Sequence, residues 1–494
     1  MSTENRFNLI EEPWIPIVDV GLVSLRQIFT HSEYRALGGN PVQKIALTKL
    51  LLAIAQAAAT PADDEAWAEL GEDRLAHACL EYLEKWHDRF WLYGDKPFLQ
   101  IPAICKAAIQ STGAVSADIA TGNTTVLLSS QVQRPMSDAE LALLLVQLMG
   151  FALGGKKTDN SVVLSPGYMG KRNDKGKPAT GKPGPCVGFM GFLHNFVLGN
   201  SLRQTLWLNL FTHTAIQNLR IYPQGIGTAP WELMPSGEVC EVALALQQSL
   251  MGRLLPMARF CLLADGGLHY SEGVAHPGYK EGVFDPSISI NLQGKDPKAI
   301  WTDPDRRPWR YLTALLSFIS QSRGAGFECF QLKNGLLRAR HILPSLGIWS
   351  AGLRVSSNAG EQYASGSDDF VESETKLDCS WLGDLWFEQF SREMELLDGL
   401  AKALYGATSG YFSAQKVDGA NYAGLACNLF WQLGEKQAQA LVDASVDVAL
   451  AKSLRKQFAA LALQAFDSYC PNDTARQLDA WAKNRPNFAN YLNA

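Results

Sequence analysis

The sequence predicts an α+β protein: a large mixed α/β N-terminal domain followed by a C-terminal antiparallel four-helix bundle. Three observations support this prediction. The first part of the chain mixes short strand-like apolar runs with helical periodicity, whereas long amphipathic segments dominate its end. The length of 494 residues exceeds that of one typical domain. A polar stretch, residues 356–374, separates the two patterns, so we expect domains at 1–375 and 376–494.

The N-terminal domain is expected to begin with strands and continue with helices. Residues 8–30 are typical of strands joined by a tight turn, and residues 44–59 and 64–93 have helical spacing that ends before Pro97. After an irregular polar segment, 116–135, a buried helix is expected to follow the capping pattern of Ser137 and Glu140. Between 186 and 354 the pattern is mixed, with strand-like pieces at 260–263 and 288–292 and a helical piece at 309–321.

The C-terminal domain is expected to consist of helices at about 381–405, 420–443 and 446–470, with a shorter one near 474–482. Residues 406–410 and 470–473 carry turn signals that separate some of these helices. Short connections between consecutive helices favour an antiparallel arrangement.

Composition and cysteine usage indicate a cytoplasmic protein with no membrane partner. Acidic residues and prolines interrupt the first thirty residues, which excludes a signal peptide. The longest apolar run, 141–153, is shorter than the roughly 18 residues that a membrane span needs. The nine cysteines are scattered and never form a CxxC pair, which is typical of reduced thiols and argues against a structural zinc site.

A basic loop, Gly154–Pro185, is the strongest candidate for binding an anion. It carries seven basic and two acidic residues in a chain whose formal net charge is −5. Glycines between the cations would let the backbone approach a phosphate chain closely, so nucleic acid is the expected ligand. A solvated surface loop is the alternative. Candidate contacts to a DNA backbone are Lys156, Lys157, Lys171 and Arg172, with Lys452, Arg455 and Lys456 on one face of a C-terminal helix.

Two further segments have side chains that suit nucleic-acid binding. The polar loop 352–366 contains Ser357, Asn358 and Gln362, which can hydrogen-bond base edges or phosphates. Lys295 and Lys298 lie in a second polar-basic stretch. Each segment taken alone is equally compatible with an ordinary surface connection.

The sequence contains no catalytic or metal-binding constellation. Residues 150–158 nearly match a phosphate-binding P-loop, but Lys157 stands where a Ser or Thr hydroxyl must bind magnesium. HExxH and GxSxG motifs are absent, and the neighbouring Asp368 and Asp369 lack a third ligand. We therefore expect no enzyme activity, no metal and no cofactor.

Several strings occur in the order found in one family: Asn8-Leu9-Ile10 with Trp14-Ile15-Pro16, Lys96-Pro97-Phe98-Leu99-Gln100, Ser165-Pro166-Gly167-Tyr168, and Ser201-Leu202-Arg203-Gln204-Thr205. Together they resemble the CasA family, the large subunits of the type I-E CRISPR surveillance complex Cascade. The resemblance implies a non-catalytic subunit bound to crRNA and other Cascade subunits. It also implies recognition of the protospacer-adjacent motif (PAM) in double-stranded target DNA, promotion of unwinding and R-loop formation, binding of the displaced non-target strand, and recruitment of a helicase-nuclease.

The resemblance also assigns roles to individual residues. A glycine loop, Gly167–Gly170, would lie in the minor groove, with Tyr168 and Met169 between its glycines. Lys295 would be a minor-groove lysine, with Lys298 as the alternative. Residues 356–359 would form a wedge beneath the PAM, with candidate contacts at Ser357, Asn358 and Ala359. The segment 121–134 would dock on the crRNA 5′ handle and a neighbouring subunit through Leu127 or Leu128.

One departure and two alternatives complete this interpretation. Some relatives have a cysteine cluster in the middle of the chain, but residues 264–273 contain no cysteine here, so no zinc is carried over. The first alternative is a scaffold subunit of a ribonucleoprotein that contacts only RNA and protein. The second is a nucleic-acid enzyme that uses Asp368 or Asp369.

Overall fold

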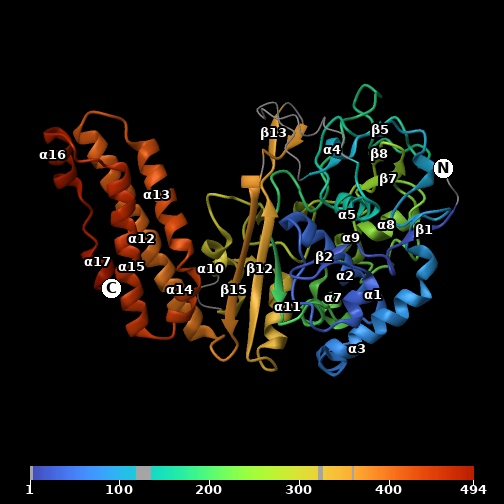
Figure 1. The fold of residues 1–494 in the computed structure, drawn as a ribbon, viewed down its shortest axis with the longest axis horizontal. Helices are drawn as coiled ribbons and strands as arrows, with labels where there is room; N and C mark the ends of the chain where they lie inside the picture. The colour runs from blue at the N-terminus through green and yellow to red at the C-terminus, as the bar shows by residue number, and fades with distance from the viewer. Residues whose placement is uncertain (1–3, 118–134, 321–325, 359–360, 366) are drawn as a thin grey trace. The chain divides into compact units, whose positions relative to one another are not determined.

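The computed structural model describes residues 4–117, 135–320, 326–358, 361–365 and 367–494 (Figure 1). Two compact units make up the chain. The first comprises Met1–Pro304, Cys329–Ile342 and Ile348–Glu372, and the second comprises Asp305–Glu328, Leu343–Gly347 and Ser373–Ala494. The second unit therefore includes segments that precede the predicted boundary at residue 375. The predicted combination of a mixed α/β part with a helical C-terminal part is confirmed.

The strands are short and form several small sheets. In the first unit, β1 pairs with β4, β2 with β3, β9 with β10 and β13 with β14, all antiparallel, and one sheet has the order β5-β8-β7. Another sheet has the order β15-β12-β6. The bounds are β1 (Arg6–Asn8), β2 (Ile15–Ile17), β3 (Gly21–Val23), β4 (Trp91–Tyr93), β5 (Ile109–Gln110), β6 (His194–Leu198), β7 (Arg259–Ala264), β8 (Gly267–Glu272), β9 (Ile290–Asn291), β10 (Lys298–Ala299), β11 (Phe327–Glu328), β12 (Ser345–Leu353), β13 (Ser356–Asn358), β14 (Glu361–Tyr363) and β15 (Phe370–Asp378).

The helices of the first unit surround α2. Most residues of α2 are apolar and buried, and even its Thr48, Lys49 and Gln56 are buried, so α2 turns no polar face to solvent. The helices are α1 (Leu25–Thr30), α2 (Pro41–Ala58), α3 (Asp64–Lys85), α4 (Thr112–Val115), α5 (Asp138–Leu148), α6 (Leu202–Asn209), α7 (His213–Leu219), α8 (Glu241–Gln247), α9 (Met251–Leu254) and α11 (Phe330–Ala339).

Most predicted N-terminal elements are found, with two differences. The β2–β3 hairpin turns as expected, but residues 25–30 form a helix because Ser24 and Gln27 make a capping box. The predicted helix at 309–321 is broken into short pieces, Pro308–Tyr311, α10 (Leu312–Leu315) and Ser317–Ile319. The capping box of Ser137 and Glu140 starts α5 as predicted.

A pair of tryptophans fastens α3 to α6. The rings of Trp67 and Trp207 stack with centroids 4.2 Å apart and planes 4° from parallel. Each indole N–H donates to the other residue's carbonyl, at 2.8 Å from Trp67 and 2.9 Å from Trp207. Both indole N–H groups therefore have a hydrogen-bond acceptor, as buried tryptophans usually do.

The second unit is mainly helical. Its long helices α12, α13 and α15 pack on one another, α14 packs on α15, and α16 packs on α12 (Figure 1). The bounds are α12 (Asp384–Ala414), α13 (Ala420–Glu435), α14 (Ala438–Ala444), α15 (Val448–Tyr469), α16 (Ala475–Asn484) and α17 (Ala489–Leu492). The predicted turn at 470–473 is present between α15 and α16.

The predicted turn at 406–410 is wrong, because α12 continues through it. Tertiary packing overrides the glycine signal there, since Leu404, Thr408 and Tyr411 are all buried on one side of the helix. Gly410 serves a close contact: a Cβ at this position would lie 2.5 Å from Asn484 Oδ1 of α16. Nothing lies within 4 Å of a Cβ at Gly406, which is a glycine without a packing role.

Candidate nucleic-acid interface

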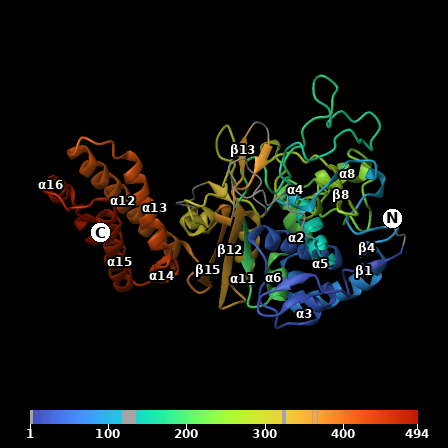
Figure 2. The ribbon, with the colours of Figure 1, turned by 45° about the horizontal axis from the view of Figure 1, so that its top comes forward.

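The β7–β8 hairpin holds both ends of the basic loop. Its two strands join through Asp265-Gly266, and Arg259 and Glu272 stand opposite each other in its register. The Arg259 guanidinium donates to Leu153 O at 3.1 Å, just before the basic loop, and to Lys182 O near its end. The Glu272 carboxylate accepts from Lys182 N at 3.2 Å. Figures 1 and 2 show that the loop between these anchors projects from the first unit.

A buried carboxylate, Glu238, lies beneath the glycine loop. Its Oε2 accepts from Ser165 N at 2.7 Å, and both of its oxygens accept from Leu164 N at 3.1 Å. Lys171 Nζ donates to its Oε1 at 2.6 Å. Burial alone would raise the pKa of Glu238, but the hydrogen bonds from Lys171 and from backbone N–H groups outweigh burial and lower it. The backbone that leads into the glycine loop is thus fixed by a charged acceptor.

The prediction that Lys171 contacts a DNA backbone is wrong. Its side chain is fully buried and pairs with the equally buried Glu238. The ammonium also donates to Val162 O at 3.0 Å and to Ser271 Oγ at 2.8 Å, so its three protons are all used. Lys171 supports the loop from inside and offers no charge to a ligand.

The glycine loop presents backbone and Met169 to solvent. Gly167 has φ +76°, and nothing lies within 4 Å of a Cβ built there, so its outer side is open. The Met169 side chain is 61% exposed. Tyr168 is half-buried and folds back, since a Cβ at Gly170 would lie 2.3 Å from its Oη. Burial raises the pKa of Tyr168. Gly170 therefore makes room for the Tyr168 ring, and Gly167 is the more open of the two glycines.

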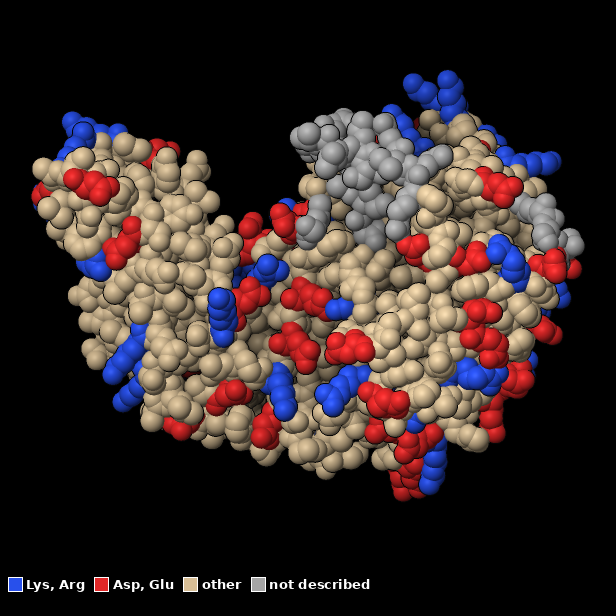
Figure 3. Space-filling model, viewed as in Figure 1, with Lys and Arg blue, Asp and Glu red and all other residues tan. Residues whose placement is uncertain are grey.

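The other cations of the basic loop are mostly exposed. Lys156, Arg172, Lys175, Lys177 and Lys182 are exposed, whereas Lys157 is half-buried. Burial lowers the pKa of Lys157, against the opposing charge of Glu361. Figure 3 shows Lys and Arg side chains on the part of the first unit that projects at the upper right, with Asp and Glu spread over the lower part of the same view. The projecting part of this view thus carries mainly positive charge, and further Lys and Arg side chains lie among the acidic ones below it.

The β13–β14 hairpin is anchored on the start of the basic loop. Its Gln362 side chain accepts from Gly154 N at 2.8 Å and donates to Phe189 O at 2.8 Å, and its backbone N–H donates to Gly154 O at 2.8 Å. Ser357 and Asn358, on the opposite strand, are exposed. The structure thereby brings two predicted segments together. Ala359 lies outside the described residues.

Lys295 and Lys298 occupy a separate hairpin. Strands β9 and β10 pair with Lys298 opposite Asn291, so Lys295 lies in the connection between them. Gly294, with φ +103°, allows the chain to reverse there. Both lysine side chains are exposed.

The predicted basic face on the C-terminal helices is smaller than expected. Lys452 and Lys456 are exposed on α15. Arg455 is buried and donates its Nε–H to Glu393 Oε2 at 2.9 Å, so the prediction that it contacts a DNA backbone is wrong. Its contact joins α15 to α12. Leu127 and Leu128, the predicted docking residues, lie outside the described residues.

Two residues that organise this interface were not predicted as such. Glu238 gives no local signal, because its partner Lys171 is 67 positions away in the sequence. Gln362 was recognised only as a polar side chain, whereas its contacts lie more than 170 positions away. Among the described residues, no group of three or more His, Cys, Asp or Glu side chains is placed to hold a metal ion. In the same part of the chain, no helix is long and apolar enough to cross a membrane.

Comparisons with known proteins relate the whole chain to one family. The family of CRISPR-associated protein Cse1 matches residues 8–465. CRISPR-associated protein CasA/Cse1 of Thermus thermophilus is 26% identical over 343 residues, and the match covers 64% of this chain and 61% of that protein's length. The solved structure of Thermobifida fusca Cse1 has a TM-score of 0.75 at 20% identity, covering 99% of this chain and 97% of its own. A crystal structure of Thermus thermophilus CasA has a TM-score of 0.73 at 19% identity and 99% coverage of both chains. At these identities the two structures show a shared fold.

Proposed function

Because the chain belongs to the CRISPR-associated protein Cse1 family, we propose that it is the non-catalytic large subunit of a type I-E Cascade complex. In this role it recognises the PAM in double-stranded DNA, promotes unwinding and R-loop formation, and recruits a helicase-nuclease. Its partners are crRNA, other Cascade subunits, the target duplex and the displaced strand. Base pairing with the guide supplies most of the sequence recognition, and the protein supplies the short duplex check.

One observation carries this proposal: the basic loop holds both an open glycine backbone and the anchor of a second exposed segment, the β13–β14 hairpin. The glycine loop offers open backbone at Gly167, and the β13–β14 hairpin offers Ser357 and Asn358. Gln362 ties the hairpin to the first residues of the basic loop. A backbone without side chains suits close approach to base edges in a minor groove, and a polar hairpin anchored on the same basic loop suits the separation of the first base pair. Lys295 is the proposed minor-groove cation, with Lys298 as the alternative, and the proposed docking residue for the crRNA handle is Leu127 or Leu128.

A paired substitution of glycines tests the recognition step. Gly167→Ala adds a methyl group to the open outer side of the glycine loop, where it would meet a bound duplex. Gly266→Ala, in the β7–β8 turn, is the matched control, because its φ of +78° is nearly the same and a Cβ there is equally free of neighbours. Both variants therefore place a Cβ on backbone with nearly the same positive φ. Affinities of assembled Cascade for target duplexes that differ only in the bases flanking the protospacer should show a loss of flank discrimination for Gly167→Ala alone.

The same measurements distinguish the recognition role from the scaffold alternative. If the complex binds all flanks equally with the unaltered chain, or if both glycine variants behave alike, the recognition role is wrong. The exposed lysines supply a second test: Lys175→Ala and Lys177→Ala should weaken binding to every duplex by the same factor and lower the salt dependence by about one counterion each.

The non-catalytic role has its own support and test. Asp369, one of the two adjacent carboxylates, is buried and accepts from Arg354 Nε at 2.8 Å, so its oxygens serve the protein's own structure. Incubation of the purified chain with DNA and Mg²⁺ or Mn²⁺ should give no cleavage. Cleavage that disappears on Asp369→Asn would favour the enzyme alternative.

A further inference from the structure

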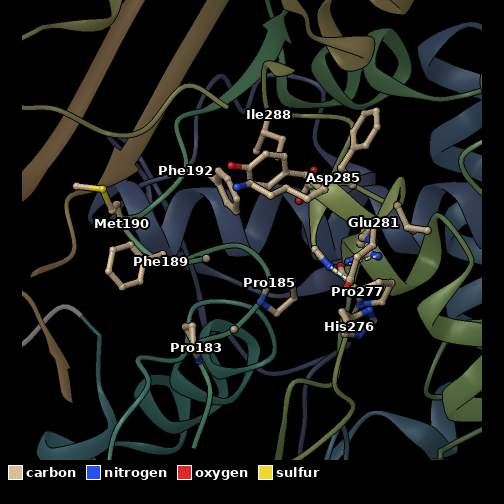
Figure 4. Close-up of a pocket in the computed structure, with 18 of the residues that line it drawn as sticks. Pro183, Pro185, Phe189, Met190, Phe192, His276, Pro277, Glu281, Asp285 and Ile288 are labelled. Atoms are coloured by element: carbon tan, nitrogen blue, oxygen red, sulfur yellow. Dashed lines mark hydrogen bonds between the residues drawn. The ribbon is translucent and has the colours of Figure 1, made fainter. Parts of the chain in front are cut away.

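The first unit contains a cleft that the proposed function does not use. It has a volume of about 660 Å³ and lies between the segments 183–192 and 276–288, with Trp301 also in its wall (Figure 4). Phe189 and Phe192 come from the first segment, and His276, Glu281 and Asp285 come from the second. A cleft of this size suits a small organic ligand or part of a larger one.

One wall of the cleft is aromatic, and the side chains at its rim are exposed to solvent. The rings of Phe192 and Trp301 stack with centroids 4.4 Å apart, and Tyr279 lies edge-on to both. These three rings support one another. At the rim, by contrast, Phe189 is 65% exposed and Met190 is 45% exposed. An exposed aromatic ring beside a hydrophobic wall is a surface on which a planar group can stack.

A buried cation, Arg253, also lines the cleft. Its side chain is 3% exposed, and its Nε has no hydrogen-bond partner. The only hydrogen bonds that its guanidinium makes to described residues are long, 3.3 Å to Gln247 O and 3.4 Å to Pro277 O. No carboxylate among the described residues forms an ion pair with it. Buried charges are normally paired with an opposite charge. The Arg253 guanidinium therefore has room for an anionic partner.

The nearby carboxylates of Asp285 and Glu281 attract Arg253 through space but form no ion pair with it. The Asp285 carboxylate pairs with the buried Lys49 ammonium and also accepts from Ser287. Glu281 accepts from Gly278 N at 2.7 Å and stays more than ion-pair distance away, and Lys280 is exposed. Arg253, Lys49 and Lys280 against Asp285 and Glu281 leave one positive charge in excess. An anionic ligand would complete the set.

Hydrogen bonds join the backbone of the cleft's first segment to the β13–β14 hairpin and to the residue before it. Gln362 Nε2 donates to Gly188 O at 3.2 Å and to Phe189 O at 2.8 Å, and Val355 N donates to Met190 O at 3.0 Å. The segment that carries the exposed ring is therefore the one on which the hairpin rests. A base that left a duplex at the hairpin would find this ring beside it.

We propose that the cleft binds one unstacked nucleotide, with its base against Phe189 and Met190 and its phosphate attracted by Arg253. An aromatic wall together with an unpaired buried cation matches the two halves of a nucleotide, as in proteins that bind single strands by stacking and charge. The nucleotide has two possible sources: a free mononucleotide, or one residue of a single strand. The single-strand source, if the strand is displaced by the hairpin, rests on the proposed function.

The test uses the full chain and a fluorescein-labelled oligothymidine, with binding followed by fluorescence polarisation. Phe189→Ala removes a ring that is mostly exposed, so the fold should tolerate it. Phe189→Tyr keeps the ring, and Leu233→Ala, at a side chain that is 52% exposed and outside the cleft, is the matched control. Loss of one stacked base should weaken binding by about tenfold for Phe189→Ala only. Arg253→Met should weaken it further and reduce its salt dependence.

The outcomes separate the two sources and the two proposals. Competition by free thymidine monophosphate would indicate a mononucleotide site, and binding that depends on Phe189 without such competition would indicate a strand. If Phe189→Ala binds like the unaltered chain, or Leu233→Ala loses as much, the inference is wrong. Flank discrimination by the assembled complex is measured independently, so it can persist when the cleft fails, and dependence on Phe189 can persist when flank discrimination fails.

Discussion

Replacing Glu238 with Gln tests how the glycine loop is held. The carboxylate accepts from Leu164 N, Ser165 N and Lys171 Nζ, and neither it nor Lys171 is exposed. A glutamine keeps the shape but offers one oxygen, and its NH₂ group faces a donor. Glu238→Gln therefore loses at least one hydrogen bond and leaves the Lys171 ammonium buried without its counter-charge.

The expected cost is large compared with the stability of a domain. Removing one partner of a buried ion pair costs about 3–5 kcal/mol, because the remaining charge stays desolvated. Stabilities of folded domains are about 5–15 kcal/mol, so the variant should unfold at a clearly lower temperature by circular dichroism. Amide hydrogen exchange at Leu164 and Ser165 should accelerate, which would localise the effect to the glycine loop.

The same pair predicts a dependence on pH. Hydrogen bonds from Lys171 and backbone N–H groups lower the pKa of Glu238 from its ordinary value of 4.5, despite burial. A carboxylate with a lowered pKa contributes stability that is fully present above pH 4.5 and is lost as pH falls through its value in the folded protein. The difference in stability between the unaltered chain and Glu238→Gln should therefore be constant above pH 4.5 and shrink below it.

Two further variants serve as controls for Glu238→Gln. Lys171→Met combined with Glu238→Gln should cost less than the sum of the two single changes, with a coupling of about 0.5–3 kcal/mol. Lys175→Met, at an exposed lysine of the same loop, should change stability by less than about 0.5 kcal/mol. If Glu238→Gln unfolded at the temperature of the unaltered chain at neutral pH, the buried ion pair would not hold the loop.

Three other predictions, which use four substitutions, have defined outcomes. Gln362→Leu leaves the buried Gly154 N–H and the Phe189 carbonyl unpaired, at about 1–3 kcal/mol. Hydrogen exchange should accelerate in the β13–β14 hairpin while the helices of the second unit stay protected. Trp207→Phe removes the donor to the Trp67 carbonyl, which should reduce the free energy of unfolding by a similar amount and lower the unfolding temperature. An unchanged unfolding temperature would contradict the reciprocal hydrogen bonding of the two tryptophans. Gly406→Ala should stabilise α12 by about 0.5–1 kcal/mol, and Gly410→Ala should give less or reverse the sign, because only the second places a methyl group against α16.

The sequence predicted the elements whose signals are local. Amphipathic periodicity gave the C-terminal helices, and the capping pattern at Ser137 gave the start of α5. Glycine misled the prediction at 406–410, because its cost in a helix is about 1 kcal/mol and the buried side chains of α12 outweigh it. Local signals are weak priors that packing overrides, and the packing partners lie elsewhere in the chain.

The candidate interface was predictable in composition but not in exposure. Lys171 and Lys175 look alike in a glycine-rich basic loop, yet one is fully buried and the other exposed. Arg455 and Lys456 differ in the same way on α15. In both cases the buried cation meets a carboxylate more than 60 positions away, Glu238 for Lys171 and Glu393 for Arg455. A sequence pattern counts charges, and only the fold decides which of them remain available.

Under the proposed function, recognition through backbone requires the backbone to be fixed, and the buried charges lie where they can fix it. A loop that reads base edges with N–H and C=O groups cannot adapt by changing rotamers, so its precision depends on its support. Here the supports are buried: Glu238 and Lys171 beneath the glycine loop, and Gln362, within β14, between the hairpin and the basic loop. Weakening a support should therefore impair flank discrimination before it impairs overall affinity, because the exposed lysines that supply affinity do not depend on that geometry.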